Sequence, residues 1–461
     1  MGTTGPTDIV VRVPRVSRWR WARDYPRLRR DPLGPLSDWL RRYGPIFQFP
    51  TARPVVVLSD PADVRHVLVA NAAQYPKGGN FELTRETLGE GLVTSNGPWH
   101  DLQRRRLLPL FQKGRLSDLP DLTRETAERV TASWRDGDAV NVVGAMSRIA
   151  LTVAGGALFK VDLLDRAEGI AEAYLAGQRY MAAGAFAPWR GWSRWFRRRS
   201  FRRATAALVA LGEDLIEATG SGAPATPFVE ALRTATDETD RPVARKRVRD
   251  ECLTFLAAAH ETVATALTWT VRSIAERPDL HRALAREADA GEAGPFSLAQ
   301  RSLREAMRLW PPVWCLGRRV EAADRLPSGV ALPAGAHVVI FPHLLSRSPD
   351  YFPEPDRFDP DRFTEKRARE IPPGVYFPFG AGARSCLGEA FAMAEMSALL
   401  VHLFQRFSFE RFAEPPRPEW LVTLWPGGGM RTRATRRPVS GSVRSNGDRK
   451  IGESPRAQTS G

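Results

Sequence analysis

The sequence predicts a single domain built mainly from α-helices, with a minor β portion. Its 461 residues are 43% hydrophobic, which is enough to bury a large core. Between Trp99 and Glu287, long stretches rich in Ala, Leu, Arg and Glu place apolar residues at helical spacing. The runs that are typical of strands are short, and they lie outside this helical region.

The elements of the N-terminal half follow from local patterns. The first 30 residues are rich in proline and arginine, and we expect them to lie over the surface of the domain. Between Pro45 and Asp60, the runs IFQF and PVVVL flank a turn and predict a short β-hairpin. Residues 219–226 have the composition of a loop. The stretch from Asp250 to Ala275 predicts one long apolar helix.

The C-terminal part changes character after Trp310, where two prolines end the helical pattern. Short strand-like runs, VALP and HVVIF, are followed by the proline-rich stretch DYFPEPDRFDPDRF. A final helix, LGEAFAMAEMSALLVHLFQRF, precedes a last extended piece, LVTLW. Residues 433–461 have few apolar side chains, which predicts a disordered basic tail. The chain therefore divides into an N-terminal segment at 1–30, a folded domain at 31–432 and the tail at 433–461.

The charge balance is strongly basic. Lysine and arginine total 67 against 52 acidic residues, which gives a formal net charge of +15, and lysine occurs at only six positions. A basic surface attracts nucleic acid, anionic lipid or an acidic protein, and charge alone does not choose among them. Because the sequence lacks aromatic-basic sheet motifs and zinc-ligand spacing, we do not expect nucleic acid as a partner.

Cysteine usage and targeting signals indicate the compartment. Cys252, Cys315 and Cys386 are too few and too far apart for a disulfide framework, so a reducing compartment is expected. The N-terminal residues contain no secretory signal, and no uninterrupted run of eighteen apolar residues predicts a transmembrane helix. We expect a cytoplasmic protein that touches the inner membrane surface at most peripherally.

The most informative window is FPFGAGARSCLGEAFA, a glycine-punctuated loop that runs directly into a helix. Cys386 lies near the N-terminus of that helix, where the helix dipole and free backbone N–H groups favour a thiolate. A thiolate is the form in which cysteine ligates haem iron. Gly382 and Gly388 would let the backbone approach a macrocycle, and Phe379 would shield the sulfur from water. A buried structural cysteine is the alternative.

The spacing Phe379-x-x-Gly382-x-Arg384-x-Cys386-x-Gly388 resembles the haem-binding loop of the haem-thiolate monooxygenases, the cytochrome P-450 superfamily. The resemblance implies the cytochrome P-450 fold, a single domain of many helices around a buried haem b. It also implies that Cys386 is the axial ligand of the iron. The expected activity is the activation of dioxygen and the hydroxylation of a C–H bond in a lipophilic substrate.

A second landmark of the family lies upstream of the cysteine loop. Glu305 and Arg308, in LREAMRLWPP, are three residues apart and share a helix face. With the prolyl break and FDPDRF that follow, they resemble the Glu–Arg–Arg cluster of this family, with Arg362 as its third member. The resemblance implies a structural role for the cluster. Arginine suits that role because its guanidinium bonds carboxylate and carbonyl groups together.

The long central helix contains FLAAAHETVATALTW. Its Glu261 and Thr262 resemble the acid–alcohol pair that relays protons to dioxygen in this family. Ala259 stands where many members have glycine. His260 is expected to point away from the oxygen side, as a packed or partly exposed side chain. Relatives that use peroxide or dehydrate hydroperoxides lack the acid–alcohol pair, so its presence favours dioxygen chemistry.

Haem propionates are anions, and they need hydrogen-bond donors. His100 and Arg104 are four residues apart on one helix face and resemble the family's propionate partners. Arg319 and Arg384 match two further partners by resemblance. At Arg104 and Arg319, the sequence leaves open whether this arginine or its immediate neighbour faces the haem.

The substrate is expected to be lipophilic, because the stretches that line the pocket in this family are mostly apolar and small here. The strings HETVATALTW and EAMRLWPPVW look like the bacterial branch that hydroxylates carotenoid rings. Other terpenoids and fatty acids stay open as substrates, and so does a haem-binding sensor without turnover. The lining stretches are residues 81–93, 174–186, 313–316 and 421–424, with Ala258 and Thr262.

A membrane contact is predicted by tryptophans among arginines. In FAPWRGWSRWFRRRSFRR, Trp189, Trp192 and Trp195 recur at helical spacing, and Trp19 and Trp21 repeat the pattern near the N-terminus. A basic, tryptophan-rich amphipathic stretch lies in lipid interfaces. Packing of these tryptophans into the core is the alternative.

The source of electrons follows from the length of chain after the cysteine loop. Only 75 residues, 387 to 461, follow Cys386, which is too few for a flavin or nicotinamide domain. We therefore expect a separate ferredoxin or flavodoxin, with its NAD(P)H-dependent reductase. A basic face near the cysteine would suit such an acidic partner.

Overall fold

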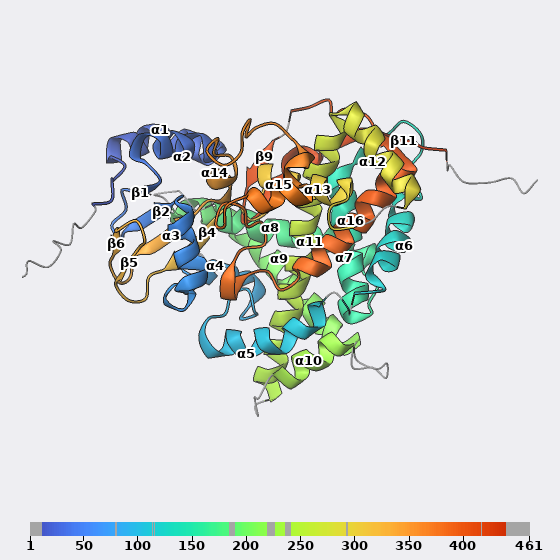
Figure 1. Cartoon of the computed structure of the whole chain (residues 1–461). Helices are drawn as coiled ribbons and strands as arrows, with labels where there is room; N and C mark the ends of the chain where they lie inside the picture. The colour runs from blue at the N-terminus through green and yellow to red at the C-terminus, as the bar shows by residue number, and fades with distance from the viewer. Residues whose placement is uncertain are drawn as a thin grey trace, which may run out of the picture.

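The computed structural model describes residues 12–78, 81–112, 114, 116–183, 190–218, 226–235, 241–291, 294–415 and 417–438. These residues form sixteen α-helices and eleven short strands, which confirms the predicted mainly helical class with a minor β portion. In Figure 1, most of the strands and the N-terminal helices gather at one side of the molecule, and the long helices fill the other side.

The helices are α1 (Arg18–Arg30), α2 (Leu33–Tyr43), α3 (Pro61–Arg65), α4 (Phe81–Leu88), α5 (Gly97–Leu107), α6 (Leu119–Thr131), α7 (Val142–Ala154), α8 (Ala167–Ala182), α9 (Arg190–Ala218), α10 (Pro227–Ala235), α11 (Arg241–Ala275), α12 (Pro278–Ala290), α13 (Leu298–Leu309), α14 (Pro342–Ser346), α15 (Glu365–Glu370) and α16 (Glu389–Arg406). The strands are β1 (Ile46–Gln48), β2 (Val55–Leu58), β3 (Asp138–Asn141), β4 (Leu316–Arg319), β5 (Asp324–Arg325), β6 (Ala331–Leu332), β7 (His337–Ile340), β8 (Phe407–Phe409), β9 (Pro418–Trp420), β10 (Leu424–Pro426) and β11 (Arg431–Arg436).

The centre of the helical part is formed by α7 and α11. Residues 250–257 and 263–272 of α11 are all buried, and so are eleven of the thirteen residues of α7. Within the described part of the chain, only Val142–Phe159 is long and apolar enough to cross a membrane, and 78% of it is buried inside the protein. A helix that is apolar on all sides and covered by protein is typical of a core helix.

The largest sheet has the strand order β1-β2-β7-β4. Its first two strands pair antiparallel, with Ile46 opposite Leu58, which confirms the predicted hairpin. β2 and β7 run parallel, and β4 pairs antiparallel with β7, so that Arg318 lies opposite Val338. Because successive side chains of a strand point to opposite faces, Arg318 and Arg319 must face different environments.

The N-terminal segment has mostly exposed side chains from residue 12 onward, but it is a regular helix from residue 18. Residues 18–30 form helix α1, which Ser17 caps by accepting a hydrogen bond from the backbone N–H of Arg20. Trp21 stacks on Trp39 of α2 at 5.6 Å, and the buried Asp24 accepts a hydrogen bond of 3.0 Å from the Trp39 indole. These buried contacts outweigh the arginine-rich composition. Residues 1–11 lie outside the described residues.

The expected start of the C-terminal tail was wrong by a few residues. Strand β11 extends to Arg436 and pairs with both β3 and β8. Thr432 and Ala434 point inward and are buried, while Arg431 and Arg433 point to solvent. The alternation of a half-buried strand was therefore hidden in an arginine-rich string. Residues 439–461 of the predicted tail and 219–225 of the predicted loop lie outside the described residues.

Candidate active site

The cysteine loop, residues 377–388, is a tight turn that leads into α16. The backbone N–H of Cys386 donates to the carbonyl of Phe379 at 2.7 Å. Gly382 has a φ of +67°, and a Cβ at this position would lie 2.1 Å from the carbonyl oxygen of Leu68. Only glycine fits there. The sequence pattern predicts that this glycine allows close approach of a macrocycle, and the structure shows that the backbone of residue 68 already requires it. Gly388 precedes the first residue of α16 and has open space beside it.

The thiol of Cys386 is accessible, yet burial raises its pKa. Both properties hold together if the sulfur faces an enclosed space inside the protein. The N–H of Gly388 and the nearby Arg104 lower the pKa, but these influences are weaker than burial. The helix terminus thus acts in the predicted direction, but burial outweighs its effect on the pKa of the thiol. A metal cation bound to the sulfur would supply the missing positive charge.

A short accessible stripe interrupts the buried face of α11. Ala258 is exposed and Ala259 and Thr262 are half-buried, although the residues before and after them in the helix are buried. Positions 258, 259 and 262 share one face of the helix. The hydroxyl of Thr262 donates to the carbonyl of Ala258 at 2.9 Å. This stripe of small side chains is accessible at the middle of α11, the longest helix among the described residues.

Glu261 and His260 flank this stripe and face away from solvent. Burial raises the pKa of Glu261 to about 7, and the nearby Gln178 amide acts in the opposite direction. His260 is buried, with Nδ1 2.9 Å from the carbonyl oxygen of Leu256 and its ring 5.0 Å from that of Tyr174. His260 is thus a packed side chain, as the sequence indicated.

Several cations meet between the cysteine loop, β4 and the turn at residues 92–95. The carbonyl of Ser95 accepts from Lys77 at 3.4 Å and from Arg384 at 3.3 Å, and Lys77 also donates to the carbonyl of Leu92 at 2.8 Å. Burial lowers the pKa of Lys77 to about 7, and Arg384 and Arg318 lower it further by repulsion. The sequence missed Lys77, because a lysine in a loop has no periodic pattern that reveals its neighbours.

Helix α5 adds the donors that the sequence predicted. Arg104 donates to the carbonyl of Ser385 at 2.8 Å and to its hydroxyl at 3.1 Å, so it lies beside the cysteine. Its neighbour Arg105 is exposed. His100 is buried, with Nδ1 2.9 Å from a carboxylate oxygen of Asp101. Burial lowers the pKa of His100 to about 4, so the ring is neutral at physiological pH.

The structure corrects the prediction at Arg319. This side chain is 51% exposed and pairs with Glu321 at 3.1 Å on the surface. The inward position on β4 belongs to Arg318, which is 6% exposed. Burial and the nearby Arg384 lower the pKa of Arg318 to about 10. The alternation of the paired strand β7, in which the opposite residue Val338 is buried, is the signal that identifies the inward arginine.

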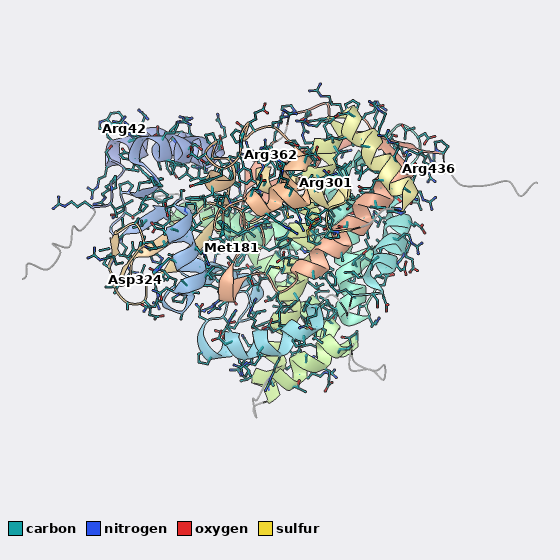
Figure 2. The ribbon with its side chains drawn as sticks, viewed as in Figure 1. Arg42, Met181, Arg301, Asp324, Arg362 and Arg436 are labelled. Atoms are coloured by element: carbon teal, nitrogen blue, oxygen red, sulfur yellow. The ribbon has the colours of Figure 1, made fainter. Side chains whose placement is uncertain are left out.

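The predicted Glu–Arg–Arg cluster is assembled behind the cysteine loop. Arg308 and Glu305 are both fully buried and form two parallel contacts of 2.7 Å. Arg308 also donates to the carbonyls of Ser346 and Pro355 at 2.8 and 2.7 Å. Arg362 lies 3.4 Å from Glu305. The cluster thereby joins α13 to the segment that precedes the cysteine loop, and Figure 2 labels Arg362 in this region.

These features fit one kind of prosthetic group. The buried cations repel one another, and a group with two carboxylates would neutralise them. An accessible, desolvated thiol beside the same cations offers a ligand for a metal at the centre of that group. Haem carries both carboxylates and an iron that binds thiolate. The fold and the site therefore define a haem-thiolate protein.

Comparisons with known proteins agree with this class. A family model described as cytochrome P450 matches residues 26–429. The chain is 31% identical over 402 residues to cyclooctatin synthase of Streptomyces melanosporofaciens, covering 81% of this chain and 85% of that protein. It is 29% identical over 367 residues to cyclooctat-9-en-7-ol 5-monooxygenase of the same organism, covering 75% and 78%. The crystal structure of CYP175A1 from Thermus thermophilus matches with a TM-score of 0.73 and 28% identity, covering 92% of this chain and 100% of that chain.

The chain belongs to the cytochrome P450 family. It is a haem-thiolate monooxygenase whose cofactor is haem b, which confirms the fold, the enzyme class and the cofactor predicted from the sequence. The haem supplies the activation of dioxygen. The protein must bind the haem, orient the substrate and deliver protons.

Proposed function

We propose that this cytochrome P450 hydroxylates a C–H bond of a terpenoid. The observation that carries the proposal is the similarity to cyclooctatin synthase, which is named for a terpenoid product, and to cyclooctat-9-en-7-ol 5-monooxygenase, which is named for oxygenation of an alcohol. The chemistry of the interior supports it, because Val93, Val313 and Leu316 are partly accessible and apolar, like the Ala258 stripe. Such a surface favours a lipophilic substrate. Neither of these two names refers to a carotenoid, so the ring of a carotenoid is a second candidate that rests on sequence strings alone.

The roles of individual residues form part of the proposal. Cys386 ligates the iron, and Phe379 shields the sulfur. Glu261 and Thr262 would deliver protons to the dioxygen that the bound haem activates. A group with a pKa near 7 both gives and regains a proton at neutral pH, which suits Glu261 to this task. The propionates are held by Lys77, His100, Arg104, Arg318 and Arg384.

Electrons come from a separate acidic ferredoxin or flavodoxin that docks behind the cysteine loop. A cavity of about 410 Å³ opens there, lined by the loop itself and by Arg65 and Arg304. Two arginines beside the thiolate loop suit an acidic partner. Reduction rates should fall as salt is raised, and arginine-to-glutamine changes at 65 and 304 should remove this dependence. Rates that ignore salt with every donor would contradict the docking proposal.

A peripheral membrane contact rests on α1. Trp19 is 77% exposed between two arginines, whereas Trp21 packs into the interior against Trp39. The side chains of Trp189, Trp192 and Trp195 lie outside the described residues. We expect a cytoplasmic enzyme that sediments with anionic liposomes at low salt, less so after Trp19→Ala. Failure to sediment at any salt would contradict the contact.

The substrate class is tested by titration of the oxidised holoenzyme with candidate compounds. A cyclic terpenoid alcohol, β-carotene and a long-chain fatty acid would each be added while the spin state of the haem is followed by absorption. The proposal predicts a low- to high-spin shift with the terpenoid. A shift with the fatty acid alone would contradict it, and a shift with no compound, together with no turnover, would favour a haem-binding sensor.

A further inference from the structure

Helix α8 and the β9–β10 hairpin are joined through two consecutive residues of the helix. Gln178 is 3% exposed, and its Oε1 accepts hydrogen bonds from the backbone N–H and the hydroxyl of Thr423, at 2.9 and 3.1 Å. Arg179 forms a surface ion pair of 3.1 Å with Glu419 of β9. The first link is buried and the second faces solvent. Figure 2 shows the end of α8, marked by Met181, near the middle of the molecule.

The other end of the Gln178 amide lies where α8 packs against α11, because the ring of Tyr174, one turn earlier on α8, is 5.0 Å from that of His260, the neighbour of Glu261. Its Nε2 forms no full hydrogen bond among the described residues, although it is buried. A buried amide nitrogen needs an acceptor. The amide also lowers the pKa of Glu261, which supports a position of Nε2 close to this carboxyl group. The two ends of one planar group therefore contact the hairpin and the acid.

Among the described residues, no charged side chain lies between the Gln178 amide and the Glu261 carboxyl group. The hydroxyl of Tyr174, one turn earlier on α8, donates to the carbonyl of Leu253 at 2.9 Å and is engaged there. His260, beside the acid on α11, is turned to its own helix and is neutral, because burial lowers its pKa to about 4. Burial and the Gln178 amide are the influences that set the pKa of Glu261. The acid thus depends on a single neutral donor.

We propose that Gln178 is a positioning residue for Glu261 and that it couples this acid to the β9–β10 hairpin, so that a substrate touching the hairpin changes the supply of protons. The amide is rigid and planar, so any shift of Thr423 that pulls on Oε1 also moves Nε2 relative to the carboxylate. The turn of the hairpin is accessible at Leu421 and Val422, where a substrate would make contact. This inference rests on the proposed function, in which Glu261 delivers protons.

The direct test is the carboxyl infrared band of Glu261 in the holoenzyme, identified by its loss in Glu261→Gln. The band is followed against pH with and without a substrate that shifts the spin state. Gln178→Leu removes the donor at similar volume and should raise the apparent pKa of Glu261 by about one unit, a tenfold change in ionisation. Substrate should move the band in the wild type but not in Gln178→Leu.

Three further variants separate positioning from general damage. Arg179→Gln breaks only the surface link and should leave the band unchanged. Thr423→Val keeps the backbone donor and loses the hydroxyl, so it should give a smaller response to substrate. Gln178→Glu places a second carboxyl beside the first and should raise the pKa further. In Gln178→Leu, substrate affinity should persist while a smaller share of the NAD(P)H consumed appears as product.

The outcomes distinguish this inference from the function on which it rests. An unchanged pKa and an unchanged substrate response in Gln178→Leu would overturn the coupling, even with an intact haem-thiolate spectrum. Undiminished product yield in Glu261→Gln would instead overturn the proton-delivery role of the acid. The infrared response would still decide whether Gln178 contacts Glu261.

Discussion

Replacing Arg318 with methionine should stabilise the apoprotein and weaken its hold on haem. The pKa of Arg318 falls from its ordinary value of 12.5 to about 10, because burial and Arg384 oppose its charge. At about 1.4 kcal/mol per pKa unit, this charge costs the folded apoprotein about 3 kcal/mol at neutral pH. The folded-state pKa of this base is depressed, so the cost is full below pH 10 and disappears only as the pH rises above it. A neutral side chain of similar length removes the cost.

The same substitution should weaken haem binding, although it stabilises the apoprotein. A charge-assisted hydrogen bond to a propionate is worth about 1.5–3 kcal/mol, so its loss should speed haem dissociation about 10- to 150-fold. Arg319, the next residue, provides the matched control, because it is exposed and pairs only with Glu321. Arg319→Met should change neither apoprotein stability nor haem retention beyond about twofold.

Two assays measure haem retention and apoprotein stability separately. Haem transfer to excess apomyoglobin, followed by absorbance, gives the dissociation rate from each holoenzyme. Urea unfolding of the apoproteins gives their free energies of unfolding. Faster haem loss from Arg319→Met than from Arg318→Met would refute the assignment of the inward arginine. Equal stability of the Arg318→Met and wild-type apoproteins would refute the cost of burying this charge near Arg384.

Three further predictions concern stability. Arg308→Ala leaves the buried Glu305 unpaired and should lower the free energy of unfolding by about 3–5 kcal/mol in urea titration. The exposed control Arg357→Ala should lower it by less than about 0.5 kcal/mol. Equal losses in the two variants would contradict the buried cluster. Burial raises the pKa of Glu251 to about 8, so the stability of the wild type should fall as the pH rises from about 4.5 to 8. Glu251→Gln should therefore raise the Tm at pH 8 and leave it unchanged at pH 4.5. A change in Tm that is the same at both pH values would contradict the buried ionisation of Glu251. Gly382→Ala forces a side chain against a backbone carbonyl at positive φ and should lower the Tm and haem content; a wild-type Tm would contradict the geometry of the loop.

Local motifs in the sequence predicted the parts of the site that depend on spacing along one element. Glu305 and Arg308 share a helix face, and the structure places them in a bidentate pair. The loop around Cys386 also follows directly from its own residues. In each case the partners are close in sequence, so the local geometry determines their contact.

Contacts between distant elements were beyond local reasoning. Lys77 meets Arg384 across 307 residues of chain, and no pattern around either residue indicates this. The sequence left open whether Arg318 or Arg319 faces inward, because the register of β4 depends on its pairing with β7. The raised pKa of Cys386 depends on enclosure by several elements, whereas the sequence reveals only the nearby helix terminus. Tertiary packing determines the contact of Lys77 with Arg384, the inward arginine of β4 and the pKa of Cys386.

The proposed function depends on Cys386 as the ligand of the haem iron. The most direct measurement is the absorption spectrum of the purified protein, reduced with dithionite under carbon monoxide, with Cys386→Ser as the control. The account predicts a strongly red-shifted Soret band in the wild type and its loss in the variant. A band typical of histidine-ligated haem in the wild type, or a red-shifted band that persists in Cys386→Ser, would contradict it.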